Sequence, residues 1–67
     1  MTIREFNQKH DRYSITMERT GVMILFDNDD ADIVATADKD SIVMEALFCE
    51  PEVMDDFRAA ASNEFDY

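Results

Sequence analysis

The sequence predicts a small α+β domain in the order α-β-β-β-α-α: a short N-terminal helix, a three-stranded antiparallel meander and two C-terminal helices. Residues 13–19 alternate apolar and polar side chains with the period of a strand. After the single proline, Pro51, apolar side chains recur at helical spacing. The chain has only one glycine and one proline, so short turns should join its elements.

The first helix is predicted from the capping residues at its N-terminus. Thr2 and Glu5 match the capping box, in which a hydroxyl and a carboxylate each accept a hydrogen bond from a backbone amide. We therefore expect a helix over about residues 3–10. The strand over residues 13–19 follows it, with Tyr13, Ile15 and Met17 on its covered face.

Two further strands complete the predicted meander. Residues 19–21 offer a turn in which Gly21 can take a positive φ. The unbroken apolar run over residues 22–26 indicates a strand that is covered on both faces. Residues 27–32 are rich in Asp and Asn, which favour turns, and a third strand over residues 33–37 should follow them.

The rest of the chain is predicted to be helical. Residues 38–41 are of types that favour turns and helix N-caps. Glu45 is the only charged residue within residues 41–48, so we expect a largely buried helix there. Pro51 suits the first position of a final helix. The acidic residues near the positive N-terminus of this helix are Glu52, Asp55 and Asp56.

The length of 67 residues allows one small domain, residues 1–67, which should bury only about 60% of its unfolded surface. Hydrophobic residues make up 46% of the chain, which is too apolar for a disordered acidic tail. The longest apolar run, residues 22–26, is too short to span a bilayer, and the N-terminus has no apolar signal core. Cys49 is the only cysteine, which suits a reducing compartment and a small buried side chain. We expect a cytoplasmic protein.

The charge of the chain is strongly uneven. The net charge is −10, yet residues 1–19 sum to +1, so the negative charge belongs to residues 20–67. A surface this acidic suits a basic partner. It disfavours direct binding to nucleic acid or to anionic membranes, because both would present negative charge to a negative surface.

Ten carboxylates are the candidate partner-binding residues. If the second and third strands form a hairpin, residues 27–32 lie at one end of the sheet, and the start of the final helix at residues 50–56 returns toward them. We expect one acidic pole there, with a smaller acidic group at the opposite end. The candidates are Asp27, Asp29, Asp30, Asp32, Asp38, Asp40, Glu50, Glu52, Asp55 and Asp56.

Such an array could imitate the phosphates of a nucleic acid. Carboxylates two residues apart on a strand, or four apart on a helix, are separated by about 5 to 7 Å, which is of the order of the spacing between neighbouring phosphates. Lys and Arg side chains that bind DNA phosphates could bind these carboxylates instead. The competing interpretation is that these acids only form a solvated face and complement the helix dipole.

Metal binding and catalysis receive little support. Aligned on Asn28, the calcium-loop pattern requires glycine where Ile33 stands and glutamate where Lys39 stands. His10 is the only histidine, and it has no Cys or His partner at zinc-ligand spacing. No glycine-rich turn could form a phosphate cradle or a nucleophile elbow. We therefore assign no catalytic, metal-binding or cofactor-binding residue.

In size and charge the chain resembles a known class. Its 67 residues, its net charge of −10 and its acidic stretches at residues 27–32 and 50–56 resemble the small acidic proteins of bacteriophages and mobile elements, such as anti-CRISPR and anti-restriction inhibitors. The resemblance rests on no shared motif, so no residue role is carried over. It implies an inhibitor, acting in the host cytoplasm, that blocks a CRISPR effector or restriction enzyme by occupying its DNA-binding surface.

The alternative is a general protein-interaction module, such as an adaptor or antitoxin-like subunit, in which an apolar patch dominates binding. Flexible methionines are suited to such a patch. The candidates are Met17, Met23, Met44 and Met54. An acidic mimic should lose affinity as salt rises, whereas an apolar adaptor should not.

Overall fold

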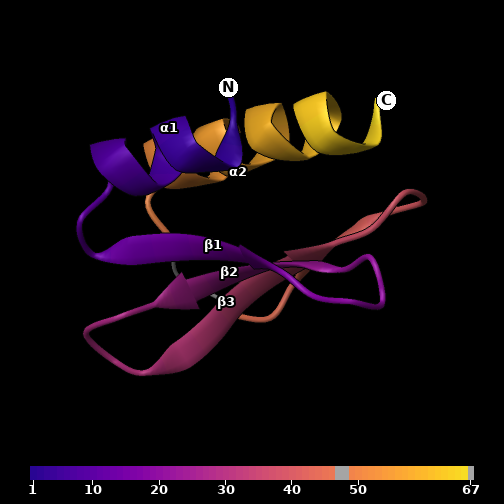
Figure 1. Cartoon of the computed structure of the whole chain (residues 1–67). Coiled ribbons are helices and arrows are strands. Elements are labelled where there is room, and N and C mark those ends of the chain that lie inside the picture. Colours follow the sequence, from indigo (N-terminus) through magenta and orange to yellow (C-terminus); the bar gives the residue numbers. More distant parts are fainter. Residues whose placement is uncertain (47–48, 67) are drawn as a thin grey trace.

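The computed structural model describes residues 1–46 and 49–66 and shows a two-layer α+β domain (Figure 1). The elements are α1 (Ile3–Lys9), β1 (Tyr13–Met17), β2 (Met23–Asp27), β3 (Asp32–Ala37), β4 (Ile42–Met44) and α2 (Pro51–Phe65). The strands form one antiparallel sheet in the order β1-β2-β3-β4. Both helices lie side by side on the same face of this sheet.

The starts of both helices confirm the capping predictions. Thr2 and Glu5 form the reciprocal capping box, with distances of 3.0 and 3.1 Å between the bonded atoms. Pro51 occupies the first turn of α2, and Asp66 ends that helix in a left-handed conformation with φ of 60°. Neither helix combines the length and the apolar character needed to cross a membrane.

Two different turns join the first three strands. The turn between β1 and β2 closes through hydrogen bonds that join Glu18 to Gly21 and Val22, and Gly21 has the predicted positive φ, 86°. In the turn between β2 and β3, Ala31 takes the left-handed conformation, with φ of 54°. A bulge then shifts the register of β3 against β2, so that Val34 and Ala35 are both buried.

The helix predicted over residues 41–48 is wrong. Ile42–Met44 form β4, which pairs with the end of β3, and the rest of that range within the described residues is not helical; residues 47 and 48 lie outside them. The carboxylate of Asp38 accepts hydrogen bonds from the amides of Asp40 and Ser41, so these residues close a hairpin. The segment is also more exposed than predicted, since Val43 and Met44 are 48% and 43% exposed.

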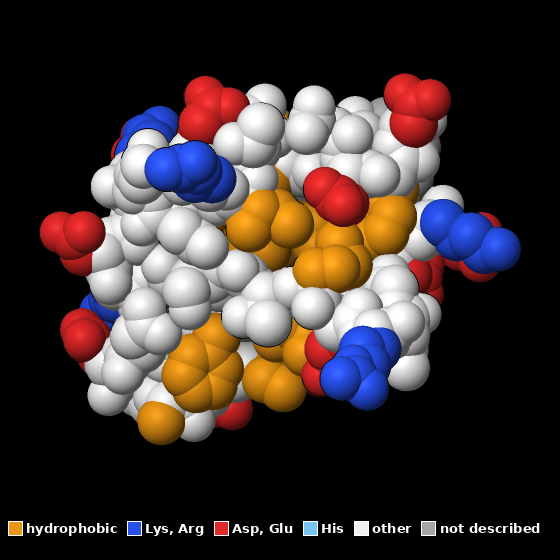
Figure 2. Space-filling model, in the orientation of Figure 1, with side chains coloured by type: hydrophobic (Ala, Val, Ile, Leu, Met, Phe, Trp, Pro, Cys, Tyr) orange, Lys and Arg blue, Asp and Glu red, His pale blue; other side chains and the backbone are white. Residues whose placement is uncertain are grey.

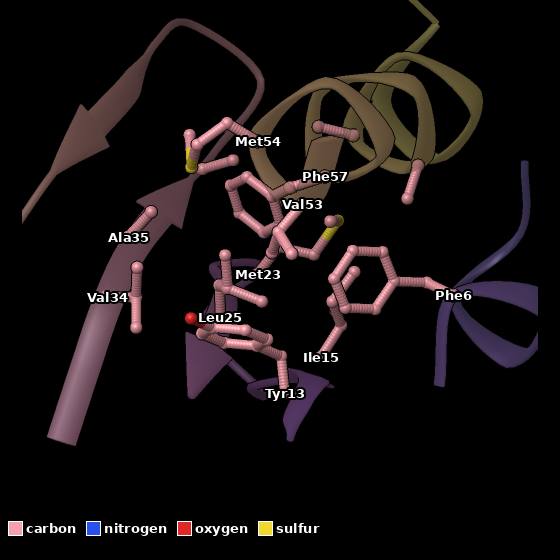
Figure 3. Close-up of a cluster of buried hydrophobic side chains, with 13 residues drawn as sticks. Phe6, Tyr13, Ile15, Met23, Leu25, Val34, Ala35, Val53, Met54 and Phe57 are labelled. Atoms are coloured by element: carbon pink, nitrogen blue, oxygen red, sulfur yellow. The ribbon is translucent and has the colours of Figure 1, made fainter. Parts of the chain in front are cut away.

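The core lies between the sheet and the two helices (Figure 3). Phe6 from α1 and Phe57 from α2 are fully buried and meet the inward side chains of the strands. These inward side chains include Tyr13, Ile15, Met23, Leu25, Val34 and Ala35. Met23 and Met54 both belong to the core, so they cannot form an exposed methionine patch.

Within the described part of the chain, no helix covers the opposite face of the sheet. We expected β2 to be covered on both faces, and this is wrong: Met23 and Leu25 are buried under the helices, whereas Ile24 and Phe26 are only partly buried on the other side. The long apolar run of β2 therefore puts Ile24 and Phe26 on an outer face that is only partly covered.

Candidate functional site

The fold brings eight of the ten candidate carboxylates to one end of the molecule. The chain leaves β2 and enters β3 at this end, and α2 also begins there (Figure 1). We call this region the acidic end. Its carboxylates are Asp27, Asp29, Asp30, Asp32, Glu50, Glu52, Asp55 and Asp56. The convergence of residues 27–32 with residues 50–56 agrees with the predicted acidic pole.

Asp27 serves the fold more than the surface. Its side chain is only 9% exposed and forms an ion pair of 3.0 Å with the guanidinium of Arg12. It also accepts hydrogen bonds from the backbone amides of Asp29 and Asp30, which fixes the turn between β2 and β3. Arg12 and these amides hold the pKa of Asp27 below its usual value.

Asp56 ties the two helices together. Its carboxylate lies 2.8 Å from Nζ of Lys9 and 2.7 Å from Nε2 of His10, and its side chain is only 17% exposed. The hydrogen bonds from Lys9 and then His10 lower the pKa of Asp56. The same carboxylate raises the pKa of Lys9, to which Glu52 also contributes at 3.1 Å.

The other carboxylates of the acidic end are exposed. Asp29 and Asp30 are 69% and 73% exposed and make only long contacts with Arg12, at 3.8 and 3.5 Å. Asp55 is 76% exposed and lies 3.5 Å from Arg58 on the same helix. Asp32, Glu50 and Glu52 are exposed too. Exposed ion pairs of this kind contribute little energy, so a competing cation could displace them.

Asp38 and Asp40 lie at the opposite end, as predicted. Asp38 is used in the β3–β4 turn, and the backbone amides of Asp40 and Ser41 lower its pKa. A pocket at this end is lined by Asp38 and Asp40, by Gly21 from the β1–β2 turn and by Phe65 from α2. Asp40 is exposed and lies outside the acidic end.

The sequence analysis missed three basic residues at the acidic end, two of them the cations Lys9 and Arg12. Residues 1–19 sum to only +1, but Lys9 and Arg12 lie among the acids and form ion pairs with them, and His10 is hydrogen-bonded to Asp56. The available signal was their spacing, because three basic side chains within four residues form the densest such group in the chain. Which acids they would meet depends on tertiary structure, so the sequence alone could not show it.

Tyr13 and Cys49 lie next to the acidic end, and their side chains are fully and partly buried, respectively. Tyr13 is 7% exposed, and the guanidinium carbon of Arg12 lies 5.7 Å from the centre of its ring. Burial raises the pKa of both Tyr13 and Cys49, and Glu50 and Asp27 add to both shifts. Cys49 is a partly buried free thiol that packs against the core, so burial and negative neighbours both oppose formation of its reactive thiolate.

The arrangement suits binding of cations on a partner surface. Within residues 1–46 and 49–66, no three His, Cys, Asp or Glu side chains form a metal-binding group. Figure 2 shows acidic side chains mostly around the outline of the molecule, interspersed with Lys and Arg. Guanidinium and ammonium groups of a partner could reach them without entering a cavity.

Comparisons of the chain with protein-family models, with curated proteins and with solved structures find no match in any of the three.

Proposed function

We propose that this protein is a non-enzymatic acidic inhibitor that binds a basic nucleic-acid-binding protein and blocks its nucleic-acid surface. The observation that supports this most is the convergence of the β2–β3 turn and the start of α2, which puts several exposed carboxylates at one end of a small domain. Lys and Arg that bind phosphates would bind these carboxylates by the same charge-assisted hydrogen bonds. A defence complex such as a CRISPR effector or a restriction enzyme is the kind of target proposed.

Not all ten candidates have the same role in this proposal. Asp27, Asp38 and Asp56 are held by internal hydrogen bonds or ion pairs, so their main contribution is to shape the two ends of the sheet. The carboxylates exposed to a partner, some of them in weak surface ion pairs, are the remaining ones of the acidic end: Asp29, Asp30, Asp32, Glu50, Glu52 and Asp55.

Lys9 and Arg12 help the protein to stay folded before it binds a partner. Without counter-charges, clustered carboxylates would destabilise a domain of this size. Lys9 bridges Glu52 and Asp56, and Arg12 bridges Asp27 and Asp30, so the repulsion is reduced on the protein side of the cluster. The outward carboxylate oxygens stay available to the solvent and to a partner.

The test is affinity capture from a bacterial lysate that contains defence systems. Immobilised protein should retain a nucleic-acid-binding protein, which either raised salt or added duplex DNA should release, because both compete for the same cations. Bound proteins are identified by mass spectrometry before and after each elution. If the captured set contains no basic or nucleic-acid-binding protein, the proposal is wrong.

A matched pair of variants separates a local acidic surface from net charge. The first variant combines Asp29→Asn, Asp30→Asn, Glu52→Gln and Asp55→Asn at the acidic end. The second neutralises four exposed acids outside it, with Glu18→Gln, Asp40→Asn, Glu64→Gln and Asp66→Asn. Both change the net charge equally. We expect the first to reduce capture by at least about tenfold and the second to reduce it much less.

A further inference from the structure

The outer face of the sheet carries apolar side chains on three neighbouring strands, and the acidic end does not explain them. Phe26 of β2 pairs directly with Ile33 of β3, and Ile24 pairs with Thr36, which in turn pairs with Val43 of β4. Side chains that are direct partners lie on the same face, about 5 Å apart. Phe26 and Ile33 are in direct contact range, and Thr36 lies between Ile24 and Val43 on the same face. We call the four apolar members across the three strands the sheet-face patch: Ile24, Phe26, Ile33 and Val43.

This patch is exposed to solvent. Ile33 and Val43 are 40% and 48% exposed, and Ile24 and Phe26 are partly exposed. Figure 2 shows hydrophobic side chains at the lower edge of the molecule, on the side of the sheet away from the helices. Threonine would form these strands as well as isoleucine or valine without exposing apolar surface, as Thr16 and Thr36 already do on this face. Exposed apolar strand positions invite association, so this face is suited to a partner.

The charge around the patch is polarised. The β2–β3 turn, which carries Asp29 and Asp30, lies at one end, directly beyond Phe26 and Ile33. At the other end, the two turns of the hairpins carry Arg19 and Lys39 beside acids. An occupant of this face would therefore meet an apolar centre and a carboxylate-rich margin toward the acidic end.

A second copy of this chain is a poor partner for the acidic margin of the patch, because it is itself acidic. A face-to-face dimer with twofold symmetry would pair two molecules that each carry a net charge of −10, and both would bring the same acidic surface. Joining through the free edge of β4 would involve a strand of only three residues. The charge complementarity favours a cationic partner instead.

We propose that the sheet-face patch binds an amphipathic helix of the partner, with its apolar stripe on Ile24, Phe26, Ile33 and Val43 and its Lys or Arg side chains directed to the acidic end. The inference rests on the proposed function, because it assumes a basic partner. A helix fits a twisted sheet face, as α1 and α2 do on the opposite side. Long basic side chains can lie along apolar surface while their charged heads reach the carboxylates. Binding would then have an apolar component that salt does not weaken.

The test uses two synthetic peptides of leucine and lysine, each of about 18 residues, or about 27 Å of helix. One peptide has the sequence order of an amphipathic helix, and the other has the same composition in scrambled order. Affinities for the intact protein are measured by calorimetry at several salt concentrations. We expect the amphipathic peptide to bind more tightly, and amide NMR shifts to change at Ile33 and Val43 more than on α1 or α2.

Variants separate the apolar and the charged contributions. The double variant Ile33→Thr with Val43→Thr should weaken binding of the amphipathic peptide by at least about tenfold while leaving its salt dependence unchanged. The variant Asp29→Asn with Asp30→Asn should reduce the salt dependence. Val43→Thr alone, the smaller change, should give part of the loss, and circular dichroism establishes that each variant is folded.

The outcomes distinguish the two proposals. Equal binding of the amphipathic peptide to the wild type and the double threonine variant would overturn the sheet-face proposal, as would NMR shifts confined to the helical face. Sedimentation that shows a wild-type dimer, lost in the threonine variant, would overturn it in favour of a second copy. If the scrambled peptide binds and responds to salt, the acidic inhibitor proposal survives such a failure. If neither peptide binds, the sheet-face proposal is overturned, while affinity capture decides the inhibitor proposal.

Discussion

At the scale of single residues, Asp27 was a candidate for partner binding from the sequence, but its carboxylate has a structural role. Its place among the acids of residues 27–32 made it a candidate for partner binding. In the structure it accepts hydrogen bonds from Arg12 and from two turn amides, and it is almost completely buried. The pattern of acids was visible in the sequence, but the pairing with Arg12, which lies in a different segment, was not.

Replacing this carboxylate should reveal its role in stability. Asp27→Asn keeps the shape of the side chain but removes its charge, so we expect the melting temperature at neutral pH to fall by several degrees. The pKa of Asp27 is lowered in the folded state, so its contribution is present above the usual Asp pKa of about 4 and is lost as pH falls through the folded pKa. The variant should therefore show a weaker loss of stability on acidification below about pH 4.

The measurement is thermal unfolding followed by circular dichroism across a series of acidic pH values. Asp40→Asn is the matched control, because Asp40 is an exposed aspartate in a turn at the other end of the sheet. It should follow the wild-type curve closely. If Asp27→Asn shows the same acid sensitivity as the wild type, the ion pair with Arg12 does not stabilise the fold.

At the scale of elements, the sequence predicted what local chemistry determines. The capping box and Pro51 correctly placed the starts of both observed helices, and the alternation in β1 and the turn at Gly21 correctly placed the first hairpin. The failure at residues 42–44 has a physical cause. Asp38 and Ser41 suit an N-cap and a hairpin turn equally, and a short apolar run fits either a helix or a strand. Pairing with the free edge of β3 decides the outcome.

The β1–β2 and β2–β3 turns allow opposite predictions for the stability of the protein. Gly21 and Ala31 both have positive φ, but only glycine is free of strain there. Gly21→Ala should destabilise the protein by about 1 to 2 kcal/mol, and no contact complicates the change because nothing lies within 4 Å of the added Cβ position. Ala31→Gly should raise stability by about 0.5 kcal/mol, since relief of strain exceeds the added entropy of the unfolded chain.

Both changes are measured by urea denaturation, which gives the free energy of unfolding and its dependence on denaturant. Gly21→Asn provides the control for the first, because asparagine tolerates the left-handed conformation and should lose less stability than alanine. Equal losses for alanine and asparagine would mean that backbone conformation is not the cause. A loss of stability in Ala31→Gly would show that its strain is smaller than the entropy of the added glycine.

At the scale of the whole molecule, the acidic end was predictable because charge asymmetry and topology could be combined. The hairpin predicted around residues 27–32 put those acids at one end of the sheet, and the returning chain brought residues 50–56 to the same end. The predicted route was wrong, since β4 and not a helix begins the return, yet the start of α2 lies where it was expected. The apolar outer face was not predicted, because an uninterrupted apolar strand also fits a sheet covered on both sides.

The charge of the whole molecule gives a final prediction about salt. Sixteen carboxylates face only six Lys and Arg side chains, so repulsion should outweigh the attractive pairs when screening is weak. Raising sodium chloride from about 10 mM to about 0.5 M should therefore increase the melting temperature, although it also weakens exposed pairs such as Lys9 with Glu52. The variant with four neutralised acids at the acidic end should gain less from salt. A wild-type melting temperature that falls with salt would instead show that the ion pairs of Lys9 and Arg12 dominate the electrostatics of the fold.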